Sequence, residues 1–204
     1  SPHRASVWGV GEEYLSSAAL DDLECAWGCT QGFLKSGDSA SVPVLCVFDS
    51  EEVGSVSPQG AGSSLLEDTL GRICRSMDWD LNRLLAQSFL ISADNAHAVH
   101  PNVPEKSDPT NRVYLNQGIV IKYNANQSYT SDAISSALFV ELCRQAGVKT
   151  QYFTNRSDLK GGGTLGSIST SQVSIASVDI GLPQLAMHSC NETAGVEDSA
   201  AMIR

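Results

Sequence analysis

The side chains best placed for chemistry in this sequence are carboxylates and one imidazole that lie next to apolar segments. They are Asp21 at the start of a predicted helix, Glu51 and Glu52 after an apolar run, Asp94 after a second run, and His188 after a third. The crevice at the carboxyl ends of parallel strands is where α/β proteins bind ligands, so these positions can meet at one site. Carboxylates and an imidazole gathered there predict a metal site of the kind that metallohydrolases use.

The residue types suit a site with two metal ions. Two zinc ions can share one carboxylate, with nitrogen and oxygen ligands at about 2.0–2.2 Å completing each shell. Asp21, Glu52, Asp94 and His188 supply such a set. Zinc lowers the pKa of a bound water towards about 7, and a carboxylate that does not bind the metal can then accept its proton. Glu51 is the candidate for that base.

Each of these residues also has a structural interpretation. Asp21 before an apolar helix can be a helix cap, the glutamate pair can be solvated loop charge, and His188 can make an ordinary polar contact. The residues alone leave both interpretations open.

Alternating helical and apolar segments predict the elements that would position these side chains. Helical spacing predicts helices over residues 21–36, 65–73, 81–85 and 131–146, and apolar runs predict strands over residues 42–48, 89–92, 119–123 and 175–180. Residues 95–112 form a predicted loop, and the glycines at 161–163 mark a turn or helix start. The order predicts an α/β fold with a mainly parallel sheet flanked by helices, as one partial domain over residues 1–204.

Composition limits the partners and the compartment. The 204 residues carry a formal net charge of −10 and have a pI near 4.7, which argues against nucleic acid or an anionic membrane as a partner. The chain has no apolar stretch approaching the ~20 residues of a membrane span. Six cysteines without close paired spacings suit reduced thiols, so we expect a cytoplasmic protein.

Five segments of the chain resemble a known family in the same order. They are residues 20–23, 49–55, 92–102, 120–122 and 185–189, and the most specific is Ala-His-Ala-Val-His-Pro-Asn at residues 96–102. These segments resemble the signature sequences of the aspartyl aminopeptidase (vacuolar aminopeptidase I) family of dinuclear zinc exopeptidases. The resemblance implies the three-layer sandwich of zinc exopeptidases and the removal of N-terminal residues from peptide substrates.

The resemblance also implies roles for the candidate residues. Asp21 would bridge two zinc ions, Glu52 and His188 would complete one site, and Asp94 would belong to the other. Glu51 matches the catalytic acid/base of the family. It would deprotonate the water that attacks the first peptide carbonyl and then pass the proton to the leaving amine.

Three further residues match substrate-binding positions of the family. His97 matches a histidine that contacts substrate, whereas Lys122 and Tyr129 match positions that line the pocket for the first side chain. Lys122 could instead be a surface lysine. Strand alternation, however, places it on the same face as Val120, where a cation would suit a substrate Asp or Glu. Acidic N-terminal residues are therefore the expected substrates.

Part of the family pattern is missing from residues 1–204. The family has another zinc-binding histidine upstream, followed by an inserted smaller domain, and His3 lacks the context of that ligand. We therefore expect the C-terminal portion of a catalytic domain, with one zinc site incomplete, a possible N-terminal half elsewhere, and a homo-oligomer in the full-length protein. The alternative is a catalytically silent metal-binding or assembly partner. A related dinuclear deacylase is a third interpretation, against which Lys122 and the loop around His97 argue.

Overall fold

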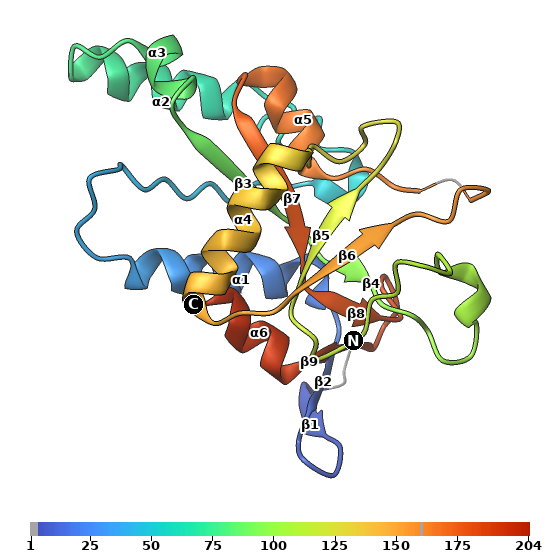
Figure 1. The fold of residues 1–204 in the computed structure, drawn as a ribbon. Coiled ribbons are helices and arrows are strands. Elements are labelled where there is room, and N and C mark those ends of the chain that lie inside the picture. The colour runs from blue at the N-terminus through green and yellow to red at the C-terminus, as the bar shows by residue number, and fades with distance from the viewer. Residues whose placement is uncertain (1–3, 160) are drawn as a thin grey trace.

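The computed structural model describes residues 4–159 and 161–204, so His3 lies outside the described residues. Two sheets and six helices make up this part of the chain (Figure 1). The four-stranded sheet has the order β3 (Phe89–Ala93), β7 (Ala176–Gly181), β5 (Ile119–Tyr123) and β6 (Thr150–Thr154). The five-stranded sheet has the order β1 (Ser6–Trp8), β2 (Tyr14–Ser17), β9 (Glu192–Gly195), β8 (Pro183–Leu185) and β4 (Ala96–His97). The helices are α1 (Leu20–Lys35), α2 (Leu65–Ser76), α3 (Leu81–Leu85), α4 (Ala133–Ala146), α5 (Leu165–Gln172) and α6 (Val196–Met202), with short 3-10 turns η1 (Glu51–Val53) and η2 (Pro104–Lys106).

The predicted α/β class with helices around a sheet is confirmed. In the four-stranded sheet β3 pairs with β7 and β5 with β6 in parallel, and only β5 and β7 are antiparallel. The five-stranded sheet is mostly antiparallel, with β4 and β8 as its parallel pair. Two of its antiparallel pairs, β1 with β2 and β8 with β9, are joined by short connections, whereas β2 and β9 pair from distant parts of the chain. The parallel pair β5 and β6 of the other sheet is joined through α4.

Helices cover both faces of the four-stranded sheet. Ile121 and Val178 point to one face and pack with Cys25 of α1 and Phe139 of α4 in the main hydrophobic core. The opposite face carries Asp179, which accepts a hydrogen bond from the side chain that precedes α5. The described chain therefore has three layers: α1 and α4 on one face, the four-stranded sheet, and α5 on the other face. In Figure 1 α4 crosses in front of the sheet.

Local sequence signals account for α4. The Asp132 side chain accepts hydrogen bonds from the backbone N–H groups of Ile134 and Ser135, and Ser135 returns a bond to the Asp132 backbone. This reciprocal cap satisfies N–H groups that have no partner within the helix. Gly147 ends the helix with φ of 68°, a conformation that glycine adopts without steric cost. The helix thus begins and ends within two residues of its predicted bounds.

The predicted strand over residues 42–48 is wrong. This segment has no regular secondary structure, and none of its N–H or C=O groups joins a backbone hydrogen bond within the described chain. Val42, Val44 and Val47 are 67%, 57% and 59% exposed. In Figure 1 the loop after α1 extends away from the sheet at the left. An apolar run becomes a strand only where a neighbouring strand pairs with it, and no described strand does so.

Several large apolar side chains of α1 are also exposed. Leu23, Trp27 and Leu34 are 66%, 53% and 70% exposed. The helix instead packs through the side that carries Gly28, where an added Cβ would lie 2.6 Å from Cγ of Met202 on α6. Close approach of α6 therefore fixes the orientation of α1.

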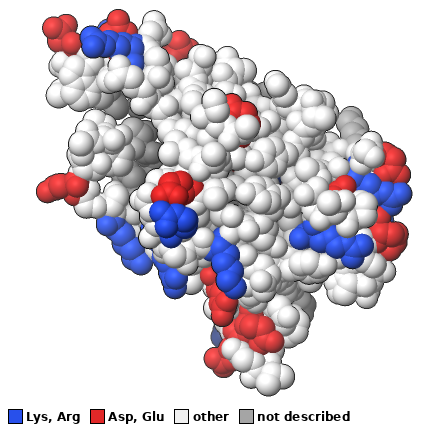
Figure 2. All heavy atoms as spheres, viewed as in Figure 1, with Lys and Arg blue, Asp and Glu red and all other residues white. Residues whose placement is uncertain are grey.

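Three further features concern the surface charge, the helices and the cysteines of the described chain. Charged side chains on the face in Figure 2 form small groups separated by uncharged surface. None of the helices in the described residues has the length and apolar character needed to cross a membrane. All six cysteines are free thiols, three of them buried.

Candidate metal centre

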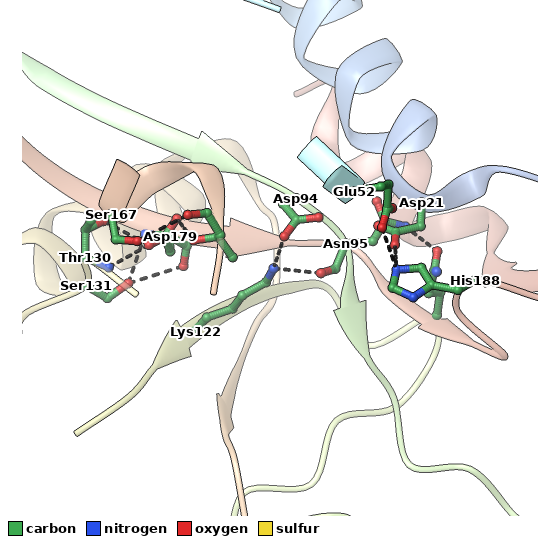
Figure 3. Close-up of polar contacts among 12 residues, drawn as sticks. Asp21, Glu52, Asp94, Asn95, Lys122, Thr130, Ser131, Ser167, Asp179 and His188 are labelled. Carbon is green, nitrogen blue, oxygen red and sulfur yellow. Dashed lines mark hydrogen bonds and ion pairs between the residues drawn. The ribbon is translucent and has the colours of Figure 1, made fainter. Parts of the chain in front are cut away.

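The structure brings Asp21, Glu52 and His188 to one point from three separate elements (Figure 3). Asp21 lies in the first turn of α1, Glu52 in η1, and His188 in the turn between β8 and β9. Nε2 of His188 lies 2.9 Å from Oδ2 of Asp21 and 3.1 Å from Oε2 of Glu52. One ligand atom from each residue lies within 4.8 Å of the other two. This spacing is compatible with one shared metal ion.

A second cluster shares Asp21. Carboxylate oxygens of Asp21, Asp22 and Asp94 also lie within 4.8 Å of one another. Asp94 directly follows β3, at the point where the chain passes from the four-stranded sheet to β4 of the other sheet. Asp21 therefore stands between two groups of possible ligands. Asp22 was not predicted to belong to the site, although its position next to Asp21 was a visible signal.

Unpartnered buried atoms test whether these residues fit a cation. Oδ1 of Asp21 and Oδ1 of Asp22 are both buried and have no hydrogen-bond partner in the described chain. A buried acceptor without a partner costs about 1–3 kcal/mol, more when it is charged. Burial is the largest cause that raises the pKa of Asp21 to about 7 and of Asp22 to about 8, with Asp94 next in both. Carboxylate oxygens with one imidazole nitrogen form a donor set that suits zinc.

The backbone at Asp21 turns its carboxylate towards the site. Asp21 has φ of −82° and ψ of 113°, which are not helical angles. Its Oδ1 has no hydrogen-bond partner in the described chain and its Oδ2 contacts His188, so the carboxylate does not cap a described backbone N–H group. His188 has φ of 66°, a left-handed conformation that is uncommon for any residue except glycine. The carboxylate of the buried Glu192 accepts hydrogen bonds from the backbone N–H groups of both residues.

Glu51 is beside the clusters but belongs to neither among the described residues. Burial raises the pKa of the Glu51 carboxyl, followed by the negative charges of Asp94 and Glu52. Lys122 and His188 act in the opposite direction. A partly buried carboxyl with a raised pKa, close to possible ligands but separate from them, is suited to accept and return a proton.

Lys122 lies on the far side of Asp94 from His188 (Figure 3). Its side chain is 4% exposed, and Nζ donates to Oδ2 of Asp94 at 3.2 Å and to the backbone oxygen of Asn95 at 2.6 Å. Nζ also lies 5.7 Å from the centre of the Tyr129 ring. Lys122 is thus a buried cation next to the two clusters of candidate metal ligands, and it is not a surface lysine. Tyr129 is buried next to it.

His97 faces solvent on β4, yet neighbouring protein affects it. Its pKa is lowered first by desolvation and then by the positive charges of Lys122 and His188. His100, in the same loop, accepts a hydrogen bond at Nδ1 from the backbone N–H of Asn102.

Asp179 holds the loop that carries Tyr129 and was not predicted. It is fully buried, and Oδ2 accepts a 2.6 Å bond from the backbone N–H of Thr130, next to Tyr129. Oδ1 accepts from the Thr164 hydroxyl at 2.9 Å. The loop carrying Tyr129 and the turn after residues 161–163 are therefore held by one carboxylate. Asp179 lies inside an apolar run, and that isolated polar residue was the available signal.

The fold and these clusters together are typical of zinc-dependent hydrolases built on an α/β sheet. The chain belongs to one such family, because the family described as Aminopeptidase I zinc metalloprotease (M18) matches residues 2–204.

Known proteins similar to this chain agree with that assignment. A probable M18 family aminopeptidase 2 of Clostridium novyi is 50% identical over 198 residues, which are 96% of this chain and 46% of the relative. An aspartyl aminopeptidase of Dictyostelium discoideum is 40% identical over 209 residues, covering 95% of this chain and 43% of the relative. The chain therefore spans less than half the length of the relatives it matches.

Solved structures show the same fold. The crystal structure of prApe1 superimposes with a TM-score of 0.92 at 30% identity, covering 98% of this chain and 44% of that one. The cryo-EM structure of the Ape4 and Nbr1 complex gives 0.91 at 37% identity, covering 98% and 40%. The structure of the S. cerevisiae mApe1 dodecamer gives 0.85 at 29% identity, covering 98% and 46%.

Proposed function

We propose that this chain supplies most of the active centre of a zinc aminopeptidase that removes N-terminal residues from peptides. The observation that carries the proposal is the convergence of Asp21, Glu52 and His188, next to the carboxylate cluster of Asp21 and Asp94. Asp21 would be shared by two zinc ions, Glu52 and His188 would complete one set of ligands, and Asp94 would belong to the other. Bound zinc supplies a Lewis acid and lowers the pKa of water.

Glu51 carries the proton in this proposal. Its carboxylate accepts a proton from the attacking water and afterwards gives it to the amine that leaves. Its raised pKa supports this role, because a base with a pKa closer to the working pH both accepts and returns the proton. Neither cluster of the described residues includes Glu51, which supports a role separate from metal ligation.

We propose acidic first residues as the preferred substrates. Lys122 is a buried cation beside the clusters, and a substrate carboxylate that reaches it would gain a charge-assisted hydrogen bond. Tyr129 and His97 would complete the substrate side. The name of the Dictyostelium relative, an aspartyl aminopeptidase, supports the same preference.

A second polypeptide segment would complete the domain. We propose that residues 1–204 are the C-terminal portion of the catalytic domain, because the relatives are more than twice as long. The exposed apolar run over residues 42–48 and the free edge of β3, which pairs only with β7 among the described strands, are consistent with added strands. The dodecamer of a structural neighbour supports a homo-oligomer of the whole protein, and free thiols support a cytoplasmic location.

One observation favours a second candidate function. The cluster of Asp21, Asp22 and Asp94 contains carboxylates alone, without a histidine from the described residues. A chain with only the His188 cluster complete would bind a single zinc ion and act as a silent assembly partner.

Reconstitution distinguishes the two candidates. The chain would be mixed with the remaining segment of the Clostridium novyi relative, in zinc, and assayed on aspartyl and leucyl anilides. Hydrolysis that requires both polypeptides supports the aminopeptidase. Formation of a zinc-containing complex without hydrolysis would instead support the silent partner.

A further inference from the structure

One buried carboxylate connects the two residues that form the closest contact in the proposed zinc centre. Oε2 of Glu192 accepts a hydrogen bond from the backbone N–H of Asp21 at 3.0 Å, and Oε1 accepts one from the backbone N–H of His188 at 2.6 Å. Glu192 is 1% exposed. Asp21 and His188 lie at opposite ends of the sequence, so this bridge fixes one segment against the other.

The position of Glu192 is itself well defined. It is the first residue of β9, a strand that pairs with β2 on one side and β8 on the other. In the register with β2, Glu192 lies opposite Ser17, just before α1 begins. The carboxylate is thus anchored on a central strand of the five-stranded sheet and reaches two flanking segments.

Both segments need such an anchor. His188 and Ala186 have left-handed backbone angles, with φ of 66° and 57°. Residues other than glycine rarely adopt this conformation. Ala19, two residues before Asp21, has φ of 56°. Turns in these conformations persist where surrounding contacts hold them. The two hydrogen bonds that Glu192 accepts are contacts of that kind.

The charge of Glu192 has no cationic partner in the described structure. The ion pairs of the described residues do not include it, and its two oxygens are directed at N–H groups of the centre. A glutamine in its place would keep one accepting oxygen and present an NH₂ group to the other N–H. Only a carboxylate can accept from both.

We propose that Glu192 is a positioning residue that sets Asp21 and His188 for metal binding through their backbone N–H groups. This inference rests on the proposed zinc centre and deepens it. Hydrogen-bonded neighbours that orient metal ligands are typically worth about 10- to 100-fold in metal affinity.

The test measures metal binding by the 204-residue chain without any activity assay. Cobalt(II) and zinc(II) are titrated into the wild type, Glu192→Gln and Glu192→Asp, and the cobalt absorption spectrum reports ligand geometry. Glu197→Gln is the matched control, since Glu197 is exposed on α6. His188→Ala identifies the site that is being titrated.

We expect both Glu192 variants to bind cobalt and zinc about 10- to 100-fold more weakly than the wild type does, and to change the cobalt spectrum. The control should do neither.

The outcomes separate this inference from the proposed function. Wild-type binding that His188→Ala removes, together with unchanged affinity and spectrum in Glu192→Gln, would overturn the role of Glu192 and leave the zinc centre intact. Wild-type chain that binds no metal would overturn both. If the variants do not fold, amide hydrogen exchange in the wild type decides. Slow exchange of the His188 N–H supports the bridge, and exchange at the rate of a free loop contradicts it.

Discussion

Lys122 on β5 and Asp94 after β3 are joined by a 3.2 Å contact across the strand that separates them. The intervening strand β7 carries Gly181 at this point. A Cβ on Gly181 would lie 2.0 Å from the backbone oxygen of Asp94 and 3.0 Å from Cε of Lys122. Because Gly181 has no side chain, Lys122 can reach Asp94 and the clusters of candidate metal ligands.

Gly181→Ala should therefore displace both Lys122 and Asp94. We expect the free energy of unfolding to fall by about 1–3 kcal/mol, the usual range for overpacking a core. Urea denaturation measures it, with Gly162→Ala as the control, because a Cβ there meets no atom within 4 Å. Equal stability of the two variants would show that β7 adapts and that Gly181 is not required.

Glu51→Gln should leave metal content unchanged and remove turnover in the reconstituted enzyme. The substitution deletes a proton acceptor without deleting a ligand, and such a loss typically lowers the rate by about 10²–10⁴. Metal analysis and anilide hydrolysis are measured on the same sample. Loss of zinc from the variant would mean that Glu51 is a ligand, and the roles of the glutamate pair would be reversed.

Lys122→Leu should reduce the preference for acidic substrates. A charge-assisted hydrogen bond is worth about 1.5–3 kcal/mol, so kcat/KM for Asp and Glu substrates should fall about tenfold to a hundredfold. Leu and Ala substrates should be spared in the reconstituted enzyme. Because Lys122 also contacts Asp94, zinc content is measured in parallel. A uniform loss over all four substrates would assign Lys122 to the shared chemistry or to the fold.

Glu24 should make stability depend on pH. Burial raises its pKa to about 7, against hydrogen bonds from Ser199 and Asn95 that lower it. The unfolded chain releases this proton near its ordinary pKa of about 4.3, whereas the folded chain keeps it up to about 7. The free energy of unfolding therefore falls as pH rises through this window, by up to about 1.4 kcal/mol per pH unit.

Glu24→Gln should make that dependence shallower, and the part that remains includes Asp21 and Asp22, whose pKa values are also raised. Urea denaturation between pH 5 and pH 8 in a chelator measures the slope, with the exposed Glu67→Gln as the control. Parallel curves for wild type and Glu24→Gln would show that the carboxyl titrates equally in the folded and unfolded chains.

The sequence predicted some elements closely and missed others. β5 was predicted to the residue, because four of its five residues (Ile119, Val120, Ile121 and Tyr123) favour strands. β9 was missed, since Glu-Thr-Ala-Gly has almost no apolar character and forms a strand only between β2 and β8. The segment over residues 42–48 failed in the opposite way, because its apolar pattern is that of a strand but no described neighbour pairs with it.

Some residues of the candidate site could be predicted from the sequence and others could not. Asp21, Glu52 and His188 could be proposed because each is a possible metal ligand next to an apolar or helical segment. The structure brings them together although the strand predicted before Glu52 does not form. Glu192 could not be found, because its importance lies in contacts with two backbone N–H groups that no local pattern encodes. Side-chain identity indicates which groups can bind metal, whereas backbone bridges between distant segments require the fold.

The zinc centre itself can be tested directly by a crystal structure of the chain soaked in zinc, with anomalous scattering recorded on both sides of the zinc absorption edge. We predict an anomalous peak about 2.0–2.2 Å from Oδ2 of Asp21, a carboxylate oxygen of Glu52 and Nε2 of His188. A well-ordered structure in which these three residues surround no anomalous density, while zinc is bound elsewhere, would contradict the account.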